Sequence, residues 1–285
     1  MSERLRVDRP GPLLEQLAEH LPGWHKRTLR QRLKLGCVRV NGAVVTRANR
    51  ALDAGDEVEV LDEAAAPPPS RVAGGVELLF VDDELVAIDK PVGLLSVASE
   101  RERGRTALAL VGAALGRPGQ PERLWPVHRL DRETSGVLLL ARSREACEGA
   151  RAEWERARKT YLAVVEGAPA EDSGVVDAPL WEDRQLFVRV GQGPDAREAR
   201  TRWRVLERRR GASLLEVELD TGRRHQIRAH LAHLGHPVVG DPRYGARAAR
   251  MGLHALRLVV PHPRDGRELA LEAPAPAALR ALLGP

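Results

Sequence analysis

The sequence predicts an α+β fold in which a small module of helices and short strands precedes a larger domain built on a mixed sheet. Beyond residue 76, strand-like segments outnumber helical ones and do not alternate strictly with them, which favours a mixed sheet over a doubly wound parallel one. A break in composition at 64–75, AAAPPPSRVAGG, indicates a linker. The length of 285 residues and the hydrophobic content of 43% suit two domains with cores of their own. We therefore expect domains at 12–62 and 76–285, joined by a linker at 63–75.

The first domain is predicted to contain two helices and a few short strands. Leucines at helical spacing mark both helices: Leu13, Leu14, Leu17 and Leu21 in the first, and Leu29 and Leu33 in the second. Asn41–Gly42 stands between valines, which is a strong signal for a tight hairpin. A second turn at Ala54-Gly55-Asp56 leads into EVEV, the expected closing strand.

Positive charge is concentrated in this first domain. The chain has 45 Lys and Arg against 40 Asp and Glu, a net charge of +5. Eight cations and no acid lie between Trp24 and Leu52: Lys26, Arg27, Arg30, Arg32, Lys34, Arg39, Arg47 and Arg50. The rest of the chain is therefore net negative. Such a run predicts a docking surface for a polyanion. The alternative is a solvated charged face on an ordinary helix.

The larger domain is predicted to begin with two strands, VELLFVDDELVAIDKP, that turn at Asp82–Asp83. GVLLLAR is a buried strand, and a helix from about 144 to 158 follows it, with Ser143 placed to cap its start. KTYLAVVEG, SLLEVELD and LHALRLVV are further strands. HQIRAHLAHLG is a helix with Ile227 in its buried stripe.

Several function classes find no support in the sequence. No apolar stretch approaches the roughly 20 residues of a membrane helix, and the first residues do not form the apolar block of a signal peptide, so we expect a cytoplasmic protein with no membrane partner. Two cysteines, Cys37 and Cys147, are too few for a disulfide framework or a four-thiolate zinc site. Four histidines, His225, His230, His233 and His236, would fan around a helix rather than converge, so no metal is expected. Neither GxSxG nor a Gly-rich phosphate loop is present.

Two polar segments carry the candidate site. PVHRLDRETSG, at 126–136, opens directly into a buried strand and is therefore held at the edge of the sheet. Its Asp131 could take part in chemistry, or it could simply accept hydrogen bonds from the amides of a turn. The second segment places Arg228 beside the buried stripe of a helix. A buried charge needs a partner of opposite sign, and Asp131 is a candidate.

Four segments, IDKPVGLLSV, HRLDRETSGVLLLAR, KTYLAVVEG and LDTGRRHQIRAHLAHLGHPVVGDPRYG, resemble the successive motifs of the RluA-type pseudouridine synthases. The resemblance covers about 76–275 in the family's order and implies a mixed, largely antiparallel catalytic sheet. The first domain, through GCVRVNGAVV and AGDEVEV, is similar to the S-four-like (αL) RNA-binding module, although its first helix lacks the usual Arg-Leu-Asp opening. This arrangement, with such a module in front of the catalytic domain, is similar to that of the family members that modify large-subunit ribosomal RNA.

The family resemblance also implies roles for individual residues. Asp131 would be the catalytic aspartate, Tyr161 would lie against the target uracil, and Arg228 would orient Asp131 through an ion pair. Arg129 would help to occupy the space left by the flipped nucleotide. The remaining residues expected at the substrate or RNA are His128, Leu130 and Ile227 at the pocket, and Lys26, Arg27, Arg30, Arg32, Lys34 and Arg39 in the first domain.

The implied reaction breaks the N1–C1′ bond of uridine and joins C5 to C1′ with no redox change, so no cofactor is expected. A uracil inside folded RNA must first be swung out into a pocket. We therefore predict a monomeric RNA pseudouridine synthase with large-subunit ribosomal RNA as its partner. The alternative is an RNA-binding ribosome-assembly factor whose catalysis is dispensable.

Overall fold

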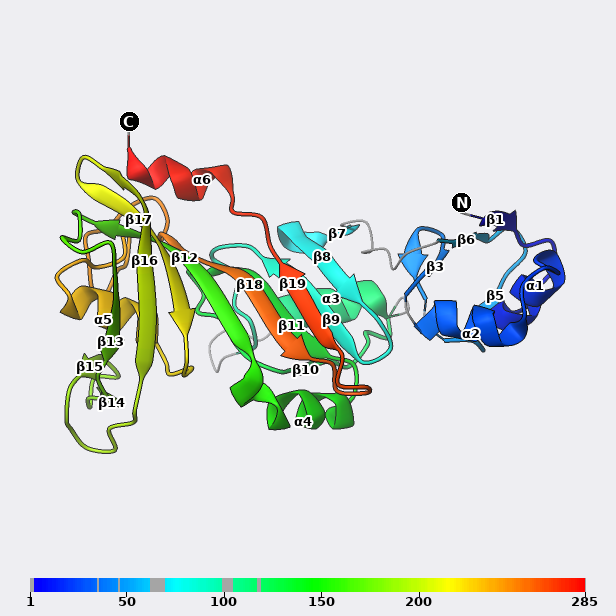
Figure 1. Ribbon diagram of the computed structural model, residues 1–285, viewed down its shortest axis with the longest axis horizontal. Coiled ribbons are helices and arrows are strands. Elements are labelled where there is room, and N and C mark those ends of the chain that lie inside the picture. Colours follow the sequence, from blue (N-terminus) through cyan, green and yellow to red (C-terminus); the bar gives the residue numbers. More distant parts are fainter. Residues whose placement is uncertain are drawn as a thin grey trace.

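The computed structural model describes residues 3–34, 36–45, 47–61, 70–98, 105–116 and 119–284, and it describes only the backbone of Gln31, Lys34, Ala43, Ser70 and Arg71. The small module formed by residues 3–61 lies at one end of an elongated molecule, and the larger domain makes up the rest (Figure 1). Within this described part, no helix is long and apolar enough to span a membrane.

The small module consists of short strands and two helices around one apolar core. Its elements are β1 (Glu3–Arg6), β2 (Gly11–Pro12), α1 (Leu13–His20), α2 (Lys26–Lys34), β3 (Val38–Val40), β4 (Ala43–Val44), β5 (Ala51–Leu52) and β6 (Glu57–Val60). A four-stranded sheet has the order β1-β6-β3-β4, and β2 pairs with β5. The leucines that the sequence assigned to the two helices are buried together, apart from half-buried Leu21, which lies just beyond α1. The sheet also takes in β1, which precedes the expected start at residue 12.

The predicted hairpin at Asn41–Gly42 is present between β3 and β4. Both turn residues have positive φ, 51° and 80°, a conformation that asparagine and glycine adopt most easily. The Asn41 side chain also binds the next turn, donating to Asp56 Oδ1 at 2.8 Å and accepting from the Glu57 amide at 2.9 Å. Two turns that are far apart in sequence are thereby fastened together.

The larger domain is an α+β structure on a mixed sheet, as the sequence predicted. Its strands are β7 (Ser70–Val72), β8 (Val76–Val81), β9 (Leu85–Lys90), β10 (Trp125–Pro126), β11 (Ser135–Ala141), β12 (Arg158–Glu166), β13 (Ser173–Asp177), β14 (Leu180–Glu182), β15 (Val188–Val190), β16 (Arg200–Arg209), β17 (Ala212–Leu219), β18 (Leu253–Pro261) and β19 (Glu268–Glu272). Its helices are α3 (Ala107–Leu115), α4 (Arg144–Ala152), α5 (Gln226–His233) and α6 (Ala277–Arg280), with short 3-10 segments η1 (Ala73–Gly75), η2 (Trp154–Arg156) and η3 (Ala281–Leu283). The strand order is β13-β16-β17-β12-β18-β11-β9-β8-β7 (Figure 1). Of the strand pairs in the described ranges, β11–β18 alone is parallel.

The buried strand β11 explains why GVLLLAR is an unbroken apolar run. Val137 and Leu139 face one side of the sheet and pack in the core that includes α4, whereas Leu138 and Leu140 face the other side and pack in the core that includes α3. A strand that is covered on both faces needs apolar residues at every position. The polar loop that precedes β11 is thereby anchored to the most buried part of the domain.

The expected linker at 63–75 is too long at its C-terminal end. Ser70–Val72 forms β7 and pairs in antiparallel register with β8, so hydrogen bonds across the sheet hold this part of the segment. The expected linker residues 63–69 lie outside the described residues. An ion pair connects the two parts of the molecule: Arg47 Nε lies 2.8 Å from Oδ1 of Asp83, in the turn between β8 and β9.

The helix expected at 144–158 is also shorter than predicted. Ser143 caps its start as expected, accepting a hydrogen bond from the Ala146 amide at 3.0 Å, but α4 ends at Ala152. A 3-10 turn follows, and Ala157 is extended because the chain must enter β12 at Arg158 to pair with β18. Sheet pairing therefore overrides the helical pattern at this end.

Candidate functional site

A cavity of about 840 Å³ lies between the loop before β11, strand β12 and the start of α5. It brings together Asp131, Tyr161 and Arg228, which lie up to 97 positions apart in the sequence. The other pocket residues that the sequence indicated also line it: His128, Arg129, Leu130 and Ile227. The cations expected to bind RNA in the small module are not among its lining residues.

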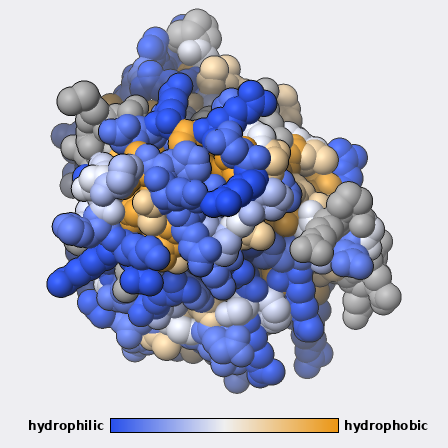
Figure 2. Space-filling view, turned by 90° about the vertical axis from the view of Figure 1, so that its right-hand side faces the viewer, coloured by the Kyte–Doolittle hydropathy of each residue, from blue (hydrophilic) through white to orange (hydrophobic). Residues whose placement is uncertain are grey.

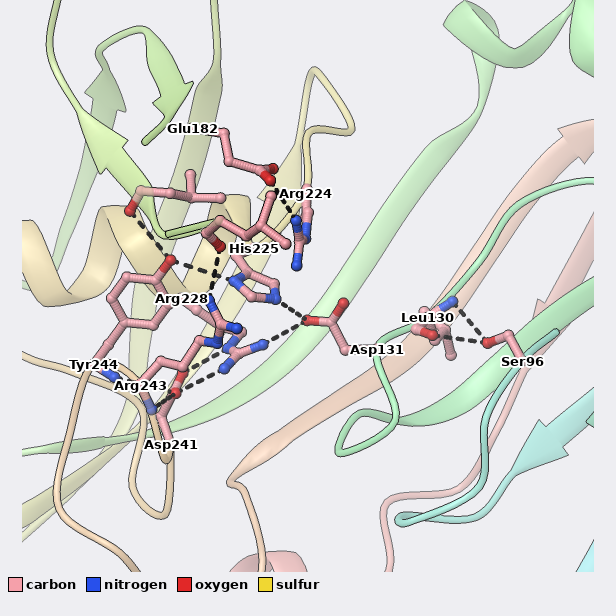
Figure 3. Close-up of polar contacts among 12 residues, drawn as sticks. Ser96, Leu130, Asp131, Glu182, Arg224, His225, Arg228, Asp241, Arg243 and Tyr244 are labelled. Atoms are coloured by element: carbon pink, nitrogen blue, oxygen red, sulfur yellow. Dashed lines mark hydrogen bonds and ion pairs between the residues drawn. The ribbon is translucent and has the colours of Figure 1, made fainter. Parts of the chain in front are cut away.

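Hydrogen bonds with Ser96 hold the backbone of the loop that carries Asp131. Ser96 is buried; its hydroxyl donates to the Leu130 carbonyl at 2.8 Å and accepts from the Leu130 amide at 3.1 Å. On the other side of Asp131, the Thr134 amide donates to the Asp131 carbonyl at 3.1 Å. Figure 3 shows the Asp131 side chain directed away from Ser96 and toward Arg228 and His225. The loop backbone is thus fixed while the carboxylate faces the cavity.

Lys90 gives the same loop a second anchor. Its side chain is fully buried at the end of β9, and Nζ donates to the carbonyls of Leu94 at 2.8 Å, Pro91 at 3.0 Å and Arg132 at 3.3 Å. Burial lowers the pKa of Lys90 to about 8, and the negative charges of Glu133 and Asp131 oppose this shift. The sequence alone indicated no role for Lys90, although IDKPVG lies in a motif of the resembled family.

Arg228 is clamped between two carboxylates. Its Nη1 donates to Asp131 Oδ2 at 2.8 Å, so the partner that the sequence suggested is in contact with it. Its Nε and Nη2 bind Asp241 Oδ2 and Oδ1 at 2.6 and 2.8 Å. Burial by itself would lower the pKa of Arg228, but the two aspartates outweigh it and raise that pKa. A guanidinium held at both edges has little freedom to rotate, so it fixes the position of the Asp131 carboxylate.

Asp241 is a second residue of the candidate site that sequence reasoning missed. It is fully buried, and it also accepts hydrogen bonds from the amides of Arg243 at 2.9 Å and Tyr244 at 3.3 Å. Burial would raise the pKa of Asp241, but these contacts and the charge of Arg228 lower it below its ordinary value. The sequence could have indicated Asp241, because it is the aspartate of GDPRYG, a turn that follows the helix of Arg228.

His225 and Tyr244 form a second group beside Asp131. His225 has a left-handed backbone, with φ 52° and ψ 19°, immediately before α5, and its Nε2 lies 3.7 Å from Asp131 Oδ2. The Tyr244 hydroxyl donates to the Val188 carbonyl at 3.1 Å and lies 3.3 Å from His225 Nδ1 (Figure 3). Burial lowers the pKa of His225 to about 4 despite the opposing charge of Asp131, so the ring is neutral near pH 7. Tyr244 packs against an apolar core, and its ring also covers the Arg228 guanidinium, 5.5 Å from the ring centre.

Apolar side chains form part of the cavity wall near Asp131. Leu130 and Ile227 are buried, and Tyr161 is half-buried with its ring packed against two apolar cores. Burial, with a smaller effect from the Asp131 charge, raises the pKa of Tyr161. Its hydroxyl is therefore protonated at neutral pH, and the ring offers a neutral aromatic surface to the cavity.

Arg129 and His128 differ in how freely they can meet a ligand. Arg129 is exposed at the rim of the cavity. His128 accepts a hydrogen bond from the Leu139 amide at Nε2, 3.0 Å away, and its ring stacks on Trp154 at 5.0 Å. Burial and the nearby Lys159 lower the pKa of His128 to about 4. One ring nitrogen of His128 is thus already used by the protein.

The cations of the small module divide into exposed and partnered side chains. Lys26, Arg27 and Arg30 are exposed on α2. Arg32 donates to the Leu61 carbonyl at 2.6 Å, and Arg39 Nη1 lies 3.7 Å from Glu59 Oε2. The side chain of Lys34 lies outside the described residues. The end of the molecule that carries this module is largely hydrophilic (Figure 2).

The four clustered histidines of the sequence are not arranged around a common metal position. His230 is buried and contacts Thr201 Oγ1 and the Ala178 carbonyl, whereas His236 contacts the Glu166 carbonyl. In the described ranges, no group of three or more His, Cys, Asp or Glu side chains is arranged to hold a metal ion.

Comparison with known proteins gives a consistent set of relatives. The family model of RNA pseudouridylate synthase matches residues 84–233. The ribosomal large subunit pseudouridine synthase D of Nitrosomonas europaea is 35% identical over 94% of this chain and 82% of that protein, and the protein of the same name from Xanthomonas campestris pv. campestris is 34% identical over 94% and 86%. Among solved structures, human RNA pseudouridylate synthase domain containing 1 is similar with a TM-score of 0.61 and 25% identity, covering 73% of this chain and 86% of that one.

Proposed function

The chain belongs to the RNA pseudouridylate synthase family, and from this premise we propose that Asp131 is the residue through which it converts uridine in RNA to pseudouridine. The observation that carries this proposal is the ion pair of Asp131 Oδ2 with Arg228 Nη1, 2.8 Å long, at the wall of the main cavity. The Arg228 guanidinium orients the Asp131 carboxylate, and Asp241 binds the other edge of that guanidinium. A carboxylate so positioned can attack a carbon centre or remove a proton.

The reaction rearranges one nucleotide without a net change in oxidation state. The N1–C1′ bond breaks, the uracil turns, C5 bonds to C1′, and the proton on C5 is replaced by one on N1. Water at C1′ during this interval would leave an abasic site, so the pocket must exclude it. Leu130, Ile227 and Tyr161 supply apolar surface beside Asp131 for this purpose.

Base flipping would bring the uracil to Tyr161. Extruding a nucleotide costs a few kcal/mol of stacking and pairing, and stacking on an aromatic ring returns about 1–3 kcal/mol. The Tyr161 ring is neutral and lines the cavity next to Asp131. Arg129, exposed at the rim, would help to fill the gap that the flipped nucleotide leaves in the RNA.

Large-subunit ribosomal RNA is the substrate we propose, and the small module at 12–62 is the part we propose to dock it. The two relatives described above are named for the large ribosomal subunit. Exposed Lys26, Arg27 and Arg30 share one helix, α2, and offer positive charge to a phosphate backbone.

The proposal is tested with purified protein and large-subunit ribosomal RNA that lacks modifications. The native chain should form pseudouridine, and Asp131→Asn, which keeps the shape but removes the charge, should form none while binding the RNA with nearly native affinity. Asp195→Asn is a matched control, because Asp195 is exposed and is not among the residues that line the cavity. Appreciable turnover by Asp131→Asn would refute the role of Asp131.

A further inference from the structure

Lys159 is a buried cation that points into the active-site cavity without a partner. Only 8% of the residue is exposed, and it lines the cavity together with His128 and Trp154. Within the described part of the protein its side-chain Nζ makes no hydrogen bond and no ion pair. Its Nζ lies 5.6 Å from the centre of the Trp154 ring, a contact that offsets only part of the cost of burying a charge.

Apart from Arg129, which is exposed at the rim, the other arginines around the cavity have partners, where the structure describes them. Arg228 binds two aspartates and Arg224 binds Glu182 at 2.7 Å. Arg223 and Arg243 donate to the backbone carbonyls of Glu198 and Leu186. Lys159 is therefore different: its side chain is largely withdrawn from water and has no negatively charged partner.

The strand that carries Lys159 also carries Tyr161. Residues two apart on a strand point to the same face, roughly 7 Å from one another, and both side chains line the cavity. Arg158, one position earlier, is exposed on the opposite face and pairs with Glu268 at 2.9 Å. A nucleotide whose base lies on Tyr161 would bring its backbone within reach of Lys159.

We propose that Lys159 is a phosphate-binding residue of the active site, taking the phosphodiester on the 5′ or 3′ side of the flipped uridine. This inference rests on the proposed function, since it assumes that RNA enters this cavity. Burial lowers the pKa of Lys159, and the more distant Asp220 opposes this shift only in part. An anion at Nζ would provide the missing charge, and a lysine ammonium is a common ligand for phosphate.

The test is a double-mutant cycle between protein and RNA. RNA substrates carry one neutral methylphosphonate, either 5′ or 3′ to the target uridine, and kcat/KM and Kd are measured for the native chain, Lys159→Met and Lys159→Arg. One of the two methylphosphonates should weaken binding to the native chain by roughly ten- to hundredfold, yet have little further effect on Lys159→Met. Lys159→Arg should recover part of the loss. Additive losses, with no coupling at either position, would overturn the proposal.

Two further readouts separate phosphate binding from a structural role. Lys159→Met should lower the salt dependence of RNA binding by about one phosphate contact, and it should not lower the Tm, because it removes an unpaired buried charge. Arg158→Met is the matched control and should leave the methylphosphonate effect at its native size. A fall in Tm with an unchanged methylphosphonate effect would assign Lys159 to the fold. Pseudouridine formation by the native chain on unmodified RNA is measured in parallel, so failure of the proposed function is distinguishable from failure of this inference.

Discussion

The cavity and the small module both contain positive charges, but they hold them in opposite ways. In the cavity Arg228 is buried and bonded at both edges of its guanidinium to Asp131 and Asp241. In the module Lys26 and Arg27 are exposed on α2. A buried, saturated cation positions another group, whereas an exposed one is available to a polyanion. Positive charge therefore fixes geometry in the cavity, whereas in the module it is exposed at the surface.

Removing Arg228 should produce the largest effect of all. Arg228→Met leaves two carboxylates without their partner, so we expect the free energy of unfolding to fall by about 3–5 kcal/mol and activity to disappear. Arg228→Lys keeps the charge but cannot contact both aspartates as a fork does, so it should recover stability in part and activity very little. Urea denaturation and pseudouridine formation measure the two effects. Native-like activity of Arg228→Lys would show that charge alone is sufficient.

Neutralising the exposed cations of α2 should act on RNA binding and not on the fold. Replacing Lys26, Arg27 and Arg30 with glutamine should weaken affinity by roughly one to two orders of magnitude and lower the salt slope by about 2–3. The Tm should stay within a degree or two of native, because these side chains are exposed.

A matched control for this triple variant lies in the larger domain. Arg144, Arg156 and Arg158 are also exposed, but each pairs with a glutamate. Their replacement with glutamine should change the salt slope much less. Equal slopes for the two triple variants would mean that the α2 cations form only a solvated face.

Tyr161 should contribute through its ring and not through its hydroxyl. Tyr161→Phe keeps the aromatic surface and should retain most of kcat/KM, whereas Tyr161→Ala should lose about 1–3 kcal/mol of transition-state stabilisation. Steady-state kinetics on one RNA fragment compare the two variants. If Phe is as damaging as Ala, the hydroxyl takes part and the stacking account is wrong.

A buried carboxylate far from the cavity should produce the smallest effect. Burial would raise the pKa of Asp82, but hydrogen bonds from His262 at 2.8 Å and from the amides of Leu85 and Glu84 lower it below its ordinary 3.8. Because the folded pKa is lowered, this stabilisation is present above pH 4 and is lost as the pH falls through the folded pKa. Asp82→Asn should cost about 1–2 kcal/mol at pH 7 and flatten the acid limb of the stability profile. An acid limb as steep as that of the native chain would contradict this assignment.

Local patterns in the sequence predicted much of the fold. Asn41–Gly42 specified its hairpin because both residues tolerate positive φ, and the run at 136–142 specified a buried strand, which the structure covers on both faces. The predicted C-terminal end of the helix at 144–158 was wrong, because the pairing of β12 with β18 is a long-range interaction that overrides helical periodicity at 153–158.

The site was predicted in part for the same physical reason. Asp131 and Arg228 were paired because a buried guanidinium requires an anion. Asp241 was missed because one carboxylate, that of Asp131, is enough to balance the charge of Arg228. Only the fold shows that a second carboxylate occupies the other edge of the guanidinium. The anchoring of the loop by Lys90 and the approach of His225 to Asp131 likewise depend on how distant segments fold together.

Pseudouridine mapping would show whether this chain isomerises uridine through Asp131. Ribosomal and transfer RNA would be mapped in cells that lack the gene, and again after rescue with either the native chain or Asp131→Ala. We expect pseudouridine sites in large-subunit ribosomal RNA that disappear in the deletion and return only with the native chain. Sites that Asp131→Ala also restores, or no change at any site, would contradict it.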